Sequence, residues 1–438
     1  MCEQDTFSAR ERRYGMMNGR PGASRSREAE TDVISTRGTA QPADLADVRT
    51  TNLAVVLRYV RIHAPCSRAD IAASTGLNKA TVSSLVTDLL ERRLLRETGM
   101  AENRIGRPAA MLTLESRPFA AIGIEVAADH LSAVAVDLTG ERLLSWRRSF
   151  PGLSATAGRA EAAVATLAGR VVNKLTALDR QILGLTVAVP GSVTDAGLVR
   201  FAPHLGWSDL DLRPALVKAL RDPAYDIVVD NDANLAALTE YRDGPHAGTP
   251  DLVALIGGVG VGAGIVAGGH LVRGDRGLAG QIGHLQLEPG GPLCRCGRRG
   301  CLEAYAGLPA LIRDALPDTA ADGPITDYAP EIERMAALAG AGDETAVRAL
   351  GEAGRRLGHA VAVLADLLDP RVVVLGGAFT TLSPWLLPAI EAEVKARALA
   401  PDEAGRVVVS TLDPAAVAAG GATLVLDRLE EGRLPGRF

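Results

Sequence analysis

Three of the five cysteines in this 438-residue chain fall within eight consecutive positions, and this cluster constrains the fold more than any other feature. Cys294, Cys296 and Cys301 follow His284 closely in the sequence. Zinc in structural sites favours closed tetrahedral sets of thiolate and imidazole ligands, and Cys₃His is one of its usual combinations. The loop 284–301 is therefore predicted to hold a structural Zn²⁺ ion. The alternative is a loop in which cysteines cluster by chance.

The length and composition indicate a globular protein of two or three domains, because 438 residues exceed the size at which one hydrophobic core stops growing. The hydrophobic share of 47% and the charged share of 23% are ordinary for a folded, soluble chain. No apolar run approaches the roughly 18 residues of a membrane helix, and the N-terminus has no hydrophobic signal segment. We therefore expect a cytoplasmic protein with no membrane partner, whose reduced thiols favour a metal over disulfides.

Charge is distributed unevenly along the chain. The net charge is −5, but residues 51–115 carry 9 Lys/Arg against 6 Asp/Glu, whereas residues 116–438 carry 30 against 38. A basic segment attached to an acidic body is the pattern that a DNA-binding module would give. The preceding residues 1–46 are rich in Arg, Ser, Gly, Glu and Thr and poor in large apolar groups, so they are predicted to form a disordered N-terminal extension.

Residues 47–116 follow the order of a winged helix-turn-helix domain. Apolar residues recur on one face of a first helix, and Ser67 is predicted to cap a second helix that ends at Gly76. Asn78 then caps a third helix over 79–91. Two helices joined by a short turn that contains glycine are the helix-turn-helix arrangement. The alternative interpretation is a plain three-helix accessory bundle.

The third helix and the segment after it carry side chains suited to DNA. Residues 94–97 and 110–114 can pair as a hairpin, and arginines at its tip would enter the minor groove. Small or basic groups on the exposed face of the third helix suit phosphates and base edges. The predicted contacts to double-stranded operator DNA are Ser67, Asn78, Lys79, Thr81, Ser83, Ser84, Arg104 and Arg107.

The remaining residues, 117–438, contain the same succession of short strands twice. The first set is expected over 120–126, 131–136 and 142–146, and the second over 252–256, 262–267 and 270–272. Helices are expected over 158–178, 232–242 and 343–368. Two similar α/β halves predict an internally duplicated fold with a cleft between two lobes.

These motifs together resemble the ROK family, named for its repressors, open reading frames and sugar kinases. The matching segments are 229–234 (Val-Asp-Asn-Asp-Ala-Asn), 283–284 (Gly-His), 294–303 (the cysteine cluster followed by Leu-Glu) and 189–191 (Val-Pro-Gly), within a resemblance from 117 to about 430. The resemblance implies a two-lobed, actin-like (RNase H-like, duplicated) sugar-kinase fold, with sugar in the cleft and zinc ordering the loop beside it. A winged helix-turn-helix ahead of this body, with Gly-Arg-Pro at 106–108, is similar to the family's transcriptional-regulator branch.

The segment that corresponds to the family's first phosphate loop departs from the family pattern. ROK kinases carry Asp-x-Gly-Gly-Thr at the first turn, whereas residues 125–129 read Glu-Val-Ala-Ala-Asp. Side chains would stand where glycine amides approach phosphates. The second loop, 258–264, keeps its glycines but has Val259 in place of a hydroxyl-bearing residue. We therefore predict no catalytic residue and no enzyme activity; the alternative is an ATP-dependent sugar kinase for hexoses or N-acetylhexosamines with a DNA-binding head.

The resemblance also implies a set of sugar contacts. These are Gly191, His204, Asn231, Asp232, Gln281, His284 and Glu303. Asp232 lies at the position of the kinase catalytic base, and its carboxylate can accept a sugar hydroxyl without any phosphate transfer; the alternative is a helix cap alone. Gln281 replaces a glutamate, and His204 an asparagine, that are common in the family, so the preferred sugar stays open.

The sequence as a whole predicts a sugar-responsive, DNA-binding transcriptional regulator, a repressor of carbohydrate uptake or catabolism genes. Its expected partners are operator DNA, a sugar or sugar phosphate effector, and further copies of the chain in a homodimer or homotetramer. A third hypothesis is a regulator whose signal is another protein, such as a sugar-transport component that docks near the zinc loop.

Overall fold

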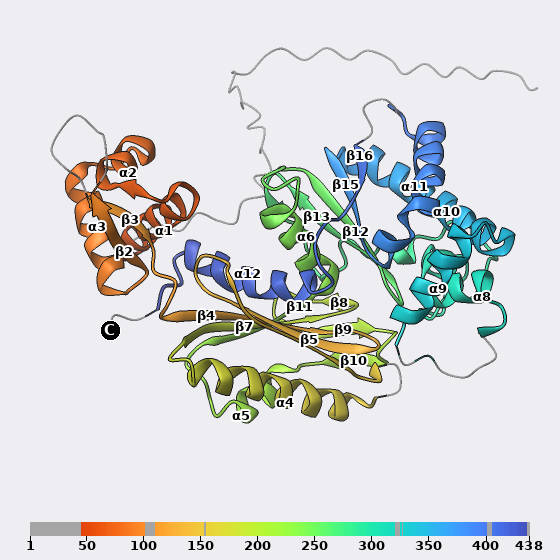
Figure 1. Ribbon diagram of the computed structural model, residues 1–438, viewed down its shortest axis with the longest axis horizontal. Helices are drawn as coiled ribbons and strands as arrows, with labels where there is room; N and C mark the ends of the chain where they lie inside the picture. Colours follow the sequence, from red (N-terminus) through yellow and green to blue (C-terminus); the bar gives the residue numbers. More distant parts are fainter. Residues whose placement is uncertain are drawn as a thin grey trace, which may run out of the picture. The chain divides into compact units, whose positions relative to one another are not determined.

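The N-terminal domain, here called the head, consists of three helices and a small antiparallel sheet (Figure 1). Its elements are α1 (Leu45–His63), β1 (Cys66–Ser67), α2 (Arg68–Thr75), α3 (Lys79–Glu91), β2 (Leu95–Met100) and β3 (Ala110–Leu114). The computed structural model describes residues 45–100, 110–152, 155–319, 325, 327–400 and 405–435. Arg104, Arg107 and nearly all of the predicted extension 1–46 therefore lie outside the described residues.

The helix boundaries of the head follow the capping signals in the sequence. Ser67 accepts from the Asp70 backbone N–H while the Asp70 carboxylate accepts from Ser67, so a complete capping box begins α2. Gly76 ends it at φ 73°, and the Asn78 side chain caps α3. β2 and β3 pair antiparallel as expected for the wing, and β1 adds a third strand that the sequence pattern had not indicated.

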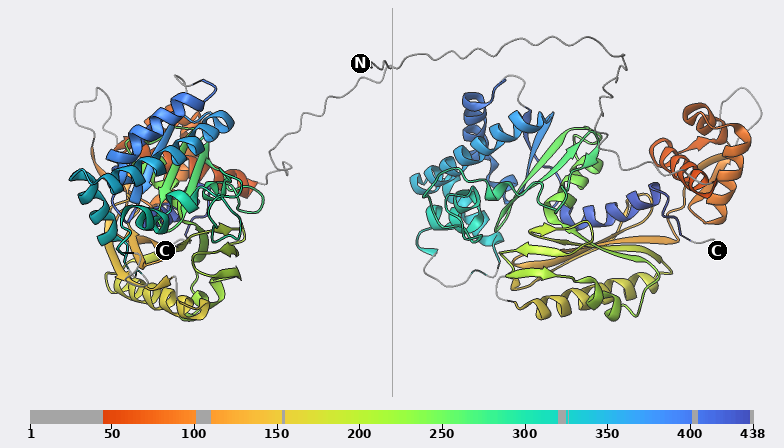
Figure 2. Two further views of the ribbon diagram at one scale, coloured as in Figure 1. Left: turned by 90° about the vertical axis from the view of Figure 1, so that its right-hand side faces the viewer. Right: turned by 180° about the vertical axis from the view of Figure 1, so that it is seen from behind.

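The first lobe is a five-stranded sheet with helices on both faces (Figures 1 and 2). Its strands are β4 (Phe119–Val126), β5 (His130–Val136), β6 (Arg142–Ser149), β7 (Gln181–Val189) and β11 (Asp226–Asn231), in the order β11-β7-β4-β5-β6. Helices α4 (Ala157–Thr176) and α5 (Arg213–Ala219) cover one face, and α12 (Ala416–Glu430) covers the other. A small sheet of β8 (Ser192–Val193), β9 (Val199–Ala202) and β10 (Trp207–Leu210) extends from the end of β7.

The second lobe repeats this sheet with a larger helical layer. Its strands are β12 (Leu252–Gly257), β13 (Val261–Ala267), β14 (His270–Leu271), β15 (Val372–Gly377) and β16 (Arg406–Val409), in the order β14-β13-β12-β15-β16. Its helices are α6 (Asp232–Asp243), η2 (Ile282–His284), α7 (Glu303–Ala306), α8 (Leu308–Ala315), α9 (Ala329–Gly340), α10 (Glu344–Leu368) and α11 (Ala378–Arg397). The long helices α10 and α11 approach closely because Gly354 and Gly358 carry no side chain; a Cβ at Gly358 would lie 2.8 Å from the Ile390 carbonyl oxygen.

The two sheets have the same topology, which confirms the predicted internal duplication. In each, two antiparallel pairings form a meander of three strands, and the first strand of that meander also pairs in parallel with a later strand. A second parallel pairing then adds the fifth strand. Parallel strands need a long crossover, and helices supply it in both halves. The three helices predicted in this region are observed as α4, α6 and α10, each within two residues of the expected ends.

The head and the first lobe share part of their hydrophobic core through the C-terminal segment. Leu429 in the last turn of α12 is 5% exposed and lies in the same cluster as the apolar residues of α1 and α3. Residues Ala46–Phe438 form one compact unit, and all the sites described below lie within it. The segment boundary predicted at 116/117 marks the change from wing to sheet, but the last turn of the body completes the core of the head.

Candidate sugar-binding cleft and metal centre

The four residues predicted to bind a metal converge in the structure. The ligand atoms of His284, Cys294, Cys296 and Cys301 all lie within 4.8 Å of one another. Cys294 Sγ is 3.7 Å from His284 Nδ1, and Cys296 Sγ is 3.7 Å from Cys301 Sγ. Two sulfurs on a tetrahedral Zn²⁺ with bonds of about 2.3 Å would lie roughly 3.8 Å apart. The geometry of the cluster is therefore compatible with a structural zinc site.

Local backbone structure explains why these ligands meet. His284 ends the short helix η2, and Cys301 is brought back beside that helix by a bridge to Gln286. Gly300 has φ 72°, and a Cβ there would lie 1.7 Å from the Glu288 carbonyl oxygen, so only glycine fits this crossing. Burial, followed by the charge of Glu303, raises the pKa of Cys294. Cys294 and Cys301 are buried and Cys296 is half-buried, and a bound cation would stabilise the three thiols as thiolates.

Glu303 connects the metal cluster to the predicted sugar contacts. Its Oε1 lies 2.9 Å from His204 Nε2 and 3.6 Å from Cys294 Sγ, and its Oε2 accepts the Val261 backbone N–H at 3.2 Å. Glu303 and His204 are 8% and 9% exposed. Burial raises the pKa of Glu303, but the hydrogen bond and charge of His204 outweigh burial and lower the pKa below its usual value. The structure therefore joins Glu303, His204 and His284 into one group.

The glycine-rich loop 258–264 passes directly against this group. A Cβ at Gly260 would lie 2.5 Å from Glu303 Oε2 and 3.0 Å from His204 Nε2. The backbone must come this close because Val261, the next residue, donates to Glu303. In this structure the loop forms a tight turn between β12 and β13 and packs against the carboxylate.

Asn231 and Asp232 form a second polar group at the N-terminus of α6. The Asn231 side chain caps the helix by accepting from the Asn234 backbone N–H, and its Nδ2 donates to the Gly191 carbonyl oxygen and to Asp232 Oδ1, each at 2.9 Å. Gly191 has φ 97°, and a Cβ there would lie 2.2 Å from the Phe201 carbonyl oxygen. The cap belongs to Asn231, so Asp232 is the first residue of the helix and not its cap.

The pKa of Asp232 lies well above the usual value of a carboxyl group. Burial, helped by the negative charge of Glu125, raises the pKa to about 7, although the Ala233 backbone N–H and the charge of His204 act to lower it. The charges of His204 and Glu125 both act on the Asp232 carboxyl, so these three residues lie near one another. Gln281 caps η2 only through its backbone, so its contact with a sugar stays a prediction.

The sequence analysis missed one pair that positions this site. Arg273 follows β14, and its Nη2 and Nε donate to Asp230 Oδ2 at 2.6 and 3.1 Å. The other oxygen, Asp230 Oδ1, accepts the Asn231 backbone N–H and Asn234 Nδ2. Asp230 is 5% exposed, and its hydrogen bonds to Arg273, Asn231 and Asn234 fix the end of β11, which carries Asn231. A buried aspartate directly before Asn-Asp was the available signal, but its distant partner was not visible in the sequence.

The exposed face of α3 carries the side chains predicted to contact DNA. Asn78, Lys79, Ser83 and Ser84 are exposed and Thr81 is half-buried. Ser67 is different, because it is 2% exposed and both its hydroxyl and its backbone N–H are engaged by Asp70. The structure therefore corrects the prediction for Ser67: its side chain caps α2 and is not available to DNA.

The comparisons with known proteins agree with this division into head and body. Residues 121–428 match the model of the ROK family, and residues 54–102 match the MarR family. The chain belongs to the ROK family. It is 30% identical over 368 residues to the DNA-binding transcriptional dual regulator NagC of Escherichia coli strain K12, covering 83% of this chain and 89% of NagC. It is 26% identical over 389 residues to the xylose repressor of Bacillus subtilis, covering 88% of this chain and 97% of that repressor.

Solved structures show the same relationship. A ROK family transcriptional regulator described as a homolog of the E. coli MLC protein superposes with a TM-score of 0.76 at 26% identity, covering 89% of this chain and 98% of that one. A ROK family glucokinase from Streptomyces griseus, solved with glucose and AMPPNP, gives 0.60 at 29% identity and covers 70% of this chain and 98% of the enzyme. This ROK protein therefore has the architecture of a transcriptional regulator, with a head that matches the MarR family on a body with the fold of ROK sugar kinases.

In this ROK protein the turn between β4 and β5 is filled by its own side chains. Glu125 accepts from Ser132 Oγ at 2.8 Å and lies 3.6 Å from His130 Nε2, while His130 Nδ1 lies 2.7 Å from Asp129 Oδ1. Burial opposes charge on His130, but the hydrogen bonds to Asp129 and Glu125 raise its pKa to about 9. Ala128 packs into the core of the second lobe.

No helix within the described parts of the chain is both long and apolar enough to cross a membrane.

Proposed function

We propose that this ROK protein represses genes for carbohydrate uptake or catabolism and releases its operator when a sugar enters the cleft. The observation that carries the proposal is the presence, in one compact unit, of a capped helix with an exposed polar face and a buried group in which Glu303 meets His204 beside the metal cluster. Relatives that share both parts are named as a xylose repressor and an N-acetylglucosamine repressor. Pentoses and N-acetylhexosamines are therefore the sugars to test first.

The proposed sugar site offers both hydrogen-bond donors and hydrogen-bond acceptors. Glu303 and Asp232 would accept from sugar hydroxyls, and Asn231 and His204 would supply amide and imidazole groups. Charged acceptors that are already buried have little hydration left to lose when a ligand binds. They therefore favour a ligand rich in hydroxyl groups over an apolar one. Gln281 and His284 complete the proposed set from the η2 side, and Gly191 supplies close backbone approach.

A zinc ion held by His284, Cys294, Cys296 and Cys301 would lock the loop that carries Glu303. When bound, the metal would keep the three sulfurs as thiolates and fix the His284 ring through Nδ1. Cys294 Sγ lies 3.6 Å from Glu303 Oε1, so the geometry of the loop would influence where this carboxylate lies. The proposed role of the metal is structural, and the residues that touch the sugar are protein side chains.

We propose that the cleft senses the sugar without phosphorylating it. Three features of the β4–β5 turn support this. Ala127 and Ala128 replace the glycines that phosphates require, Asp129 Oδ2 accepts the Tyr328 backbone N–H at 3.2 Å, and Glu125 is engaged by His130 and Ser132. A carboxylate at Asp232 alone would then act only as a hydroxyl acceptor.

Operator binding is proposed to use two copies of the head. A symmetric dimer would place two α3 helices in successive major grooves, about 34 Å apart. The dimer would have one arrangement that binds the operator and one that does not. A sugar can change operator affinity only if it binds these two arrangements with different affinities.

The decisive experiment measures operator affinity and catalysis with the same preparation. Duplexes selected from a random pool by the purified protein supply the operator, and fluorescence anisotropy then gives Kd with and without xylose, glucose, N-acetylglucosamine and their 6-phosphates or 5-phosphate. We expect one of these ligands to weaken operator binding by about tenfold or more, and an ADP-release assay to show no turnover with any of them. Sugar-dependent ADP release would instead support the kinase alternative. An operator affinity that does not change with any of the ligands would contradict the proposal.

A further inference from the structure

Helix α12 is held tightly between the first sheet and α6. A Cβ at Gly123 would lie 1.8 Å from the Ala418 carbonyl oxygen, so β4 and α12 approach backbone to backbone. On its other side, a Cβ at Gly420 would lie 2.0 Å from the Leu235 carbonyl oxygen of α6. Thr239 Oγ1 of α6 donates to the Ala416 carbonyl oxygen at 2.7 Å. These contacts leave no side-chain layer that could absorb a displacement of α6 against α12.

The far end of α12 belongs to the head. Leu429 and Leu434 pack with the apolar residues of α1 and α3. Gly432 passes so close to α1 that a Cβ there would lie 2.4 Å from Thr50 Cγ2. The Arg92 guanidinium donates to the Pro435 carbonyl oxygen. The segment from Leu429 to Pro435 therefore attaches the body to the head.

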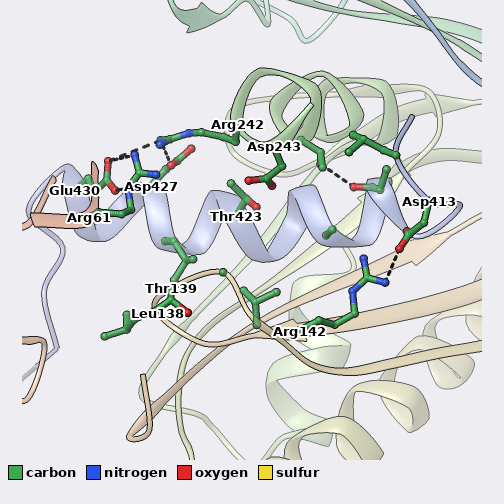
Figure 3. A pocket seen from close by; sticks show the side chains of 17 residues that line it. Arg61, Leu138, Thr139, Arg142, Arg242, Asp243, Asp413, Thr423, Asp427 and Glu430 are labelled. Carbon is green, nitrogen blue, oxygen red and sulfur yellow. Dashed lines mark hydrogen bonds and ion pairs between the residues drawn. The ribbon is translucent and has the colours of Figure 1, made fainter. Parts of the chain in front are cut away.

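A chain of ion pairs crosses the same junction, between the body and α1. Arg242 in the last turn of α6 pairs with Asp427 and lies 3.8 Å from Glu430 Oε2. Glu430 in turn pairs with Arg61 of α1. Figure 3 shows these four side chains together at one end of a cavity of about 340 Å³. The Glu430 side chain is 9% exposed and that of Arg242 is 19% exposed, so water screens this pair much less than a surface pair.

Helix α6 connects this junction to the cleft. It is 12 residues long and begins at Asp232, which follows Asn231, whereas Arg242 lies in its last turn. A helix of this length spans about 18 Å and moves as a rigid rod on the scale of a ligand contact. A shift of the N-terminus of α6 at Asp232 therefore also moves Arg242 and, through Glu430, affects Arg61.

We propose that Arg242 and Glu430 are positioning residues that couple the sugar cleft to the DNA-binding head. This inference rests on the proposed function, because it assigns the route by which an occupied cleft would alter operator affinity. In the arrangement described here, the pairs from Arg242 to Glu430 and from Glu430 to Arg61 fix the head on α12. A displacement of α6 at Asp232 carries α12 with it, because the two helices pack backbone to backbone and Arg242 holds Glu430. The displacement then changes the pair between Glu430 and Arg61 and so frees or reorients the head. The adjoining cavity supplies the space into which these side chains can move.

The test measures a coupling ratio, defined as operator Kd with saturating sugar divided by operator Kd without sugar. Sugar affinity is measured separately by calorimetry, and folding by thermal melting. We expect Arg242→Met and Glu430→Gln each to bring the ratio to within about twofold of one, while sugar affinity stays within about threefold of that of the unaltered protein. The double variant is expected to match the single variants, because both changes break one relay. Arg242→Lys, which keeps the charge, is expected to retain part of the coupling.

Arg142→Met is the matched control. Arg142 lines the same cavity and pairs with Asp413 at 2.5 Å, and Figure 3 shows this pair at the end of the cavity away from Arg61 and Glu430. Its coupling ratio is expected to equal that of the unaltered protein. An unchanged ratio in both Arg242→Met and Glu430→Gln, or an equal loss in Arg142→Met, would overturn the relay.

A second readout keeps the relay separate from the proposed function. If the unaltered protein binds operator equally with and without every sugar, the proposed function fails. Hydrogen exchange of the full chain then tests the relay, because it predicts faster exchange of α1 backbone amides in Arg242→Met and Glu430→Gln than in Arg142→Met. Equal exchange in all three variants would refute a role for these residues in holding the head.

Discussion

Glu303 Oε1 lies 2.9 Å from His204 Nε2, and this contact joins the loop of the metal cluster to the loop after β9. Both side chains are at least nine-tenths buried, so removing either one would leave the other buried without its partner. Cys294 Sγ lies 3.6 Å from the same carboxylate oxygen. Glu303 therefore touches the metal cluster, and His284 belongs both to that cluster and to the proposed sugar site, so the two cannot be perturbed independently.

Glu303→Gln is expected to weaken sugar binding by roughly tenfold or more, because it replaces a charge-assisted acceptor with a neutral one. Operator affinity without sugar is expected to stay unchanged, since Glu303 lies outside the head. Calorimetry with the active sugar measures the first effect and anisotropy the second. Glu391→Gln, at an exposed carboxylate on α11, is the matched control. Equal sugar affinity in both variants would remove Glu303 from the site.

Sugar affinity is expected to rise with pH across about pH 7, because burial raises the pKa of Asp232 to about 7 and the ionised carboxylate is the better hydroxyl acceptor. Asp232→Asn is expected to bind more weakly and to lose this part of the pH dependence while sparing operator binding. Calorimetric titrations between pH 6 and pH 8 compare the two proteins. A pH profile that is the same in both would show that Asp232 does not titrate in the free cleft.

The same group makes a testable contribution to stability. The pKa of Asp232 is raised from 3.8 to about 7 on folding, so between these values the folded protein keeps a proton that the unfolded chain has lost. The contribution of Asp232 to the free energy of unfolding therefore falls as pH rises from about 4 to about 7 and is constant above that range. Urea unfolding of the unaltered protein and Asp232→Asn should give a stability difference that shifts in favour of the variant over this window. A difference independent of pH would contradict the assignment.

The purified protein is expected to contain one zinc ion per chain by elemental analysis. Cys301→Ser is expected to lower the zinc content to a small fraction of this value, because structural sites need their full ligand set. Sugar response should be lost before operator affinity, since the cluster lies beside Glu303 and not in the head. Cys66→Ser, which alters a buried cysteine of the head, should keep the full zinc content. Equal zinc loss in both variants would point to unfolding and not to ligation.

Lys79→Ala is expected to weaken binding to all duplexes and to reduce the slope of log Kd against log salt concentration by about one. Lys79 is exposed at the start of α3, the position from which a recognition helix reaches phosphates. Lys174→Ala, at an exposed lysine of α4, should leave both quantities unchanged. A slope equal in the two variants would remove Lys79 from the phosphate contacts.

Ser67→Ala is expected to lower the stability of the head by about 1 kcal/mol, the usual cost of losing an N-cap. The salt slope should not change, because Ser67 is occupied by Asp70. Ser83→Ala, at an exposed position of α3, should alter stability by less than about 0.5 kcal/mol. A normal melting curve with a reduced salt slope in Ser67→Ala would restore its role as a DNA contact.

Much of this molecule could be predicted from local sequence because local chemistry decides it. Gly76 ends α2 and Asn78 caps α3 at the expected residues, since a left-handed turn and a side-chain cap depend on a few neighbouring residues. The cysteine cluster could likewise be predicted, because three ligands lie within one loop and their spacing limits the geometry. Ser67 shows the limit: the capping role was foreseen, but only its burial excluded a role in DNA binding.

Local sequence signals predicted the three helices of the head, the repeated meander of strands and the ligands that one loop can gather. Tertiary structure decided the pairs between distant residues: Arg273 with Asp230, His204 with Glu303, and Arg242 with Glu430. Such partners depend on how two lobes and a head pack, and the sequence spacing between them carries no information about that packing. The reason is physical, because a cap or turn is fixed by bonds a few residues apart, whereas a buried ion pair is fixed by the shape of the whole core.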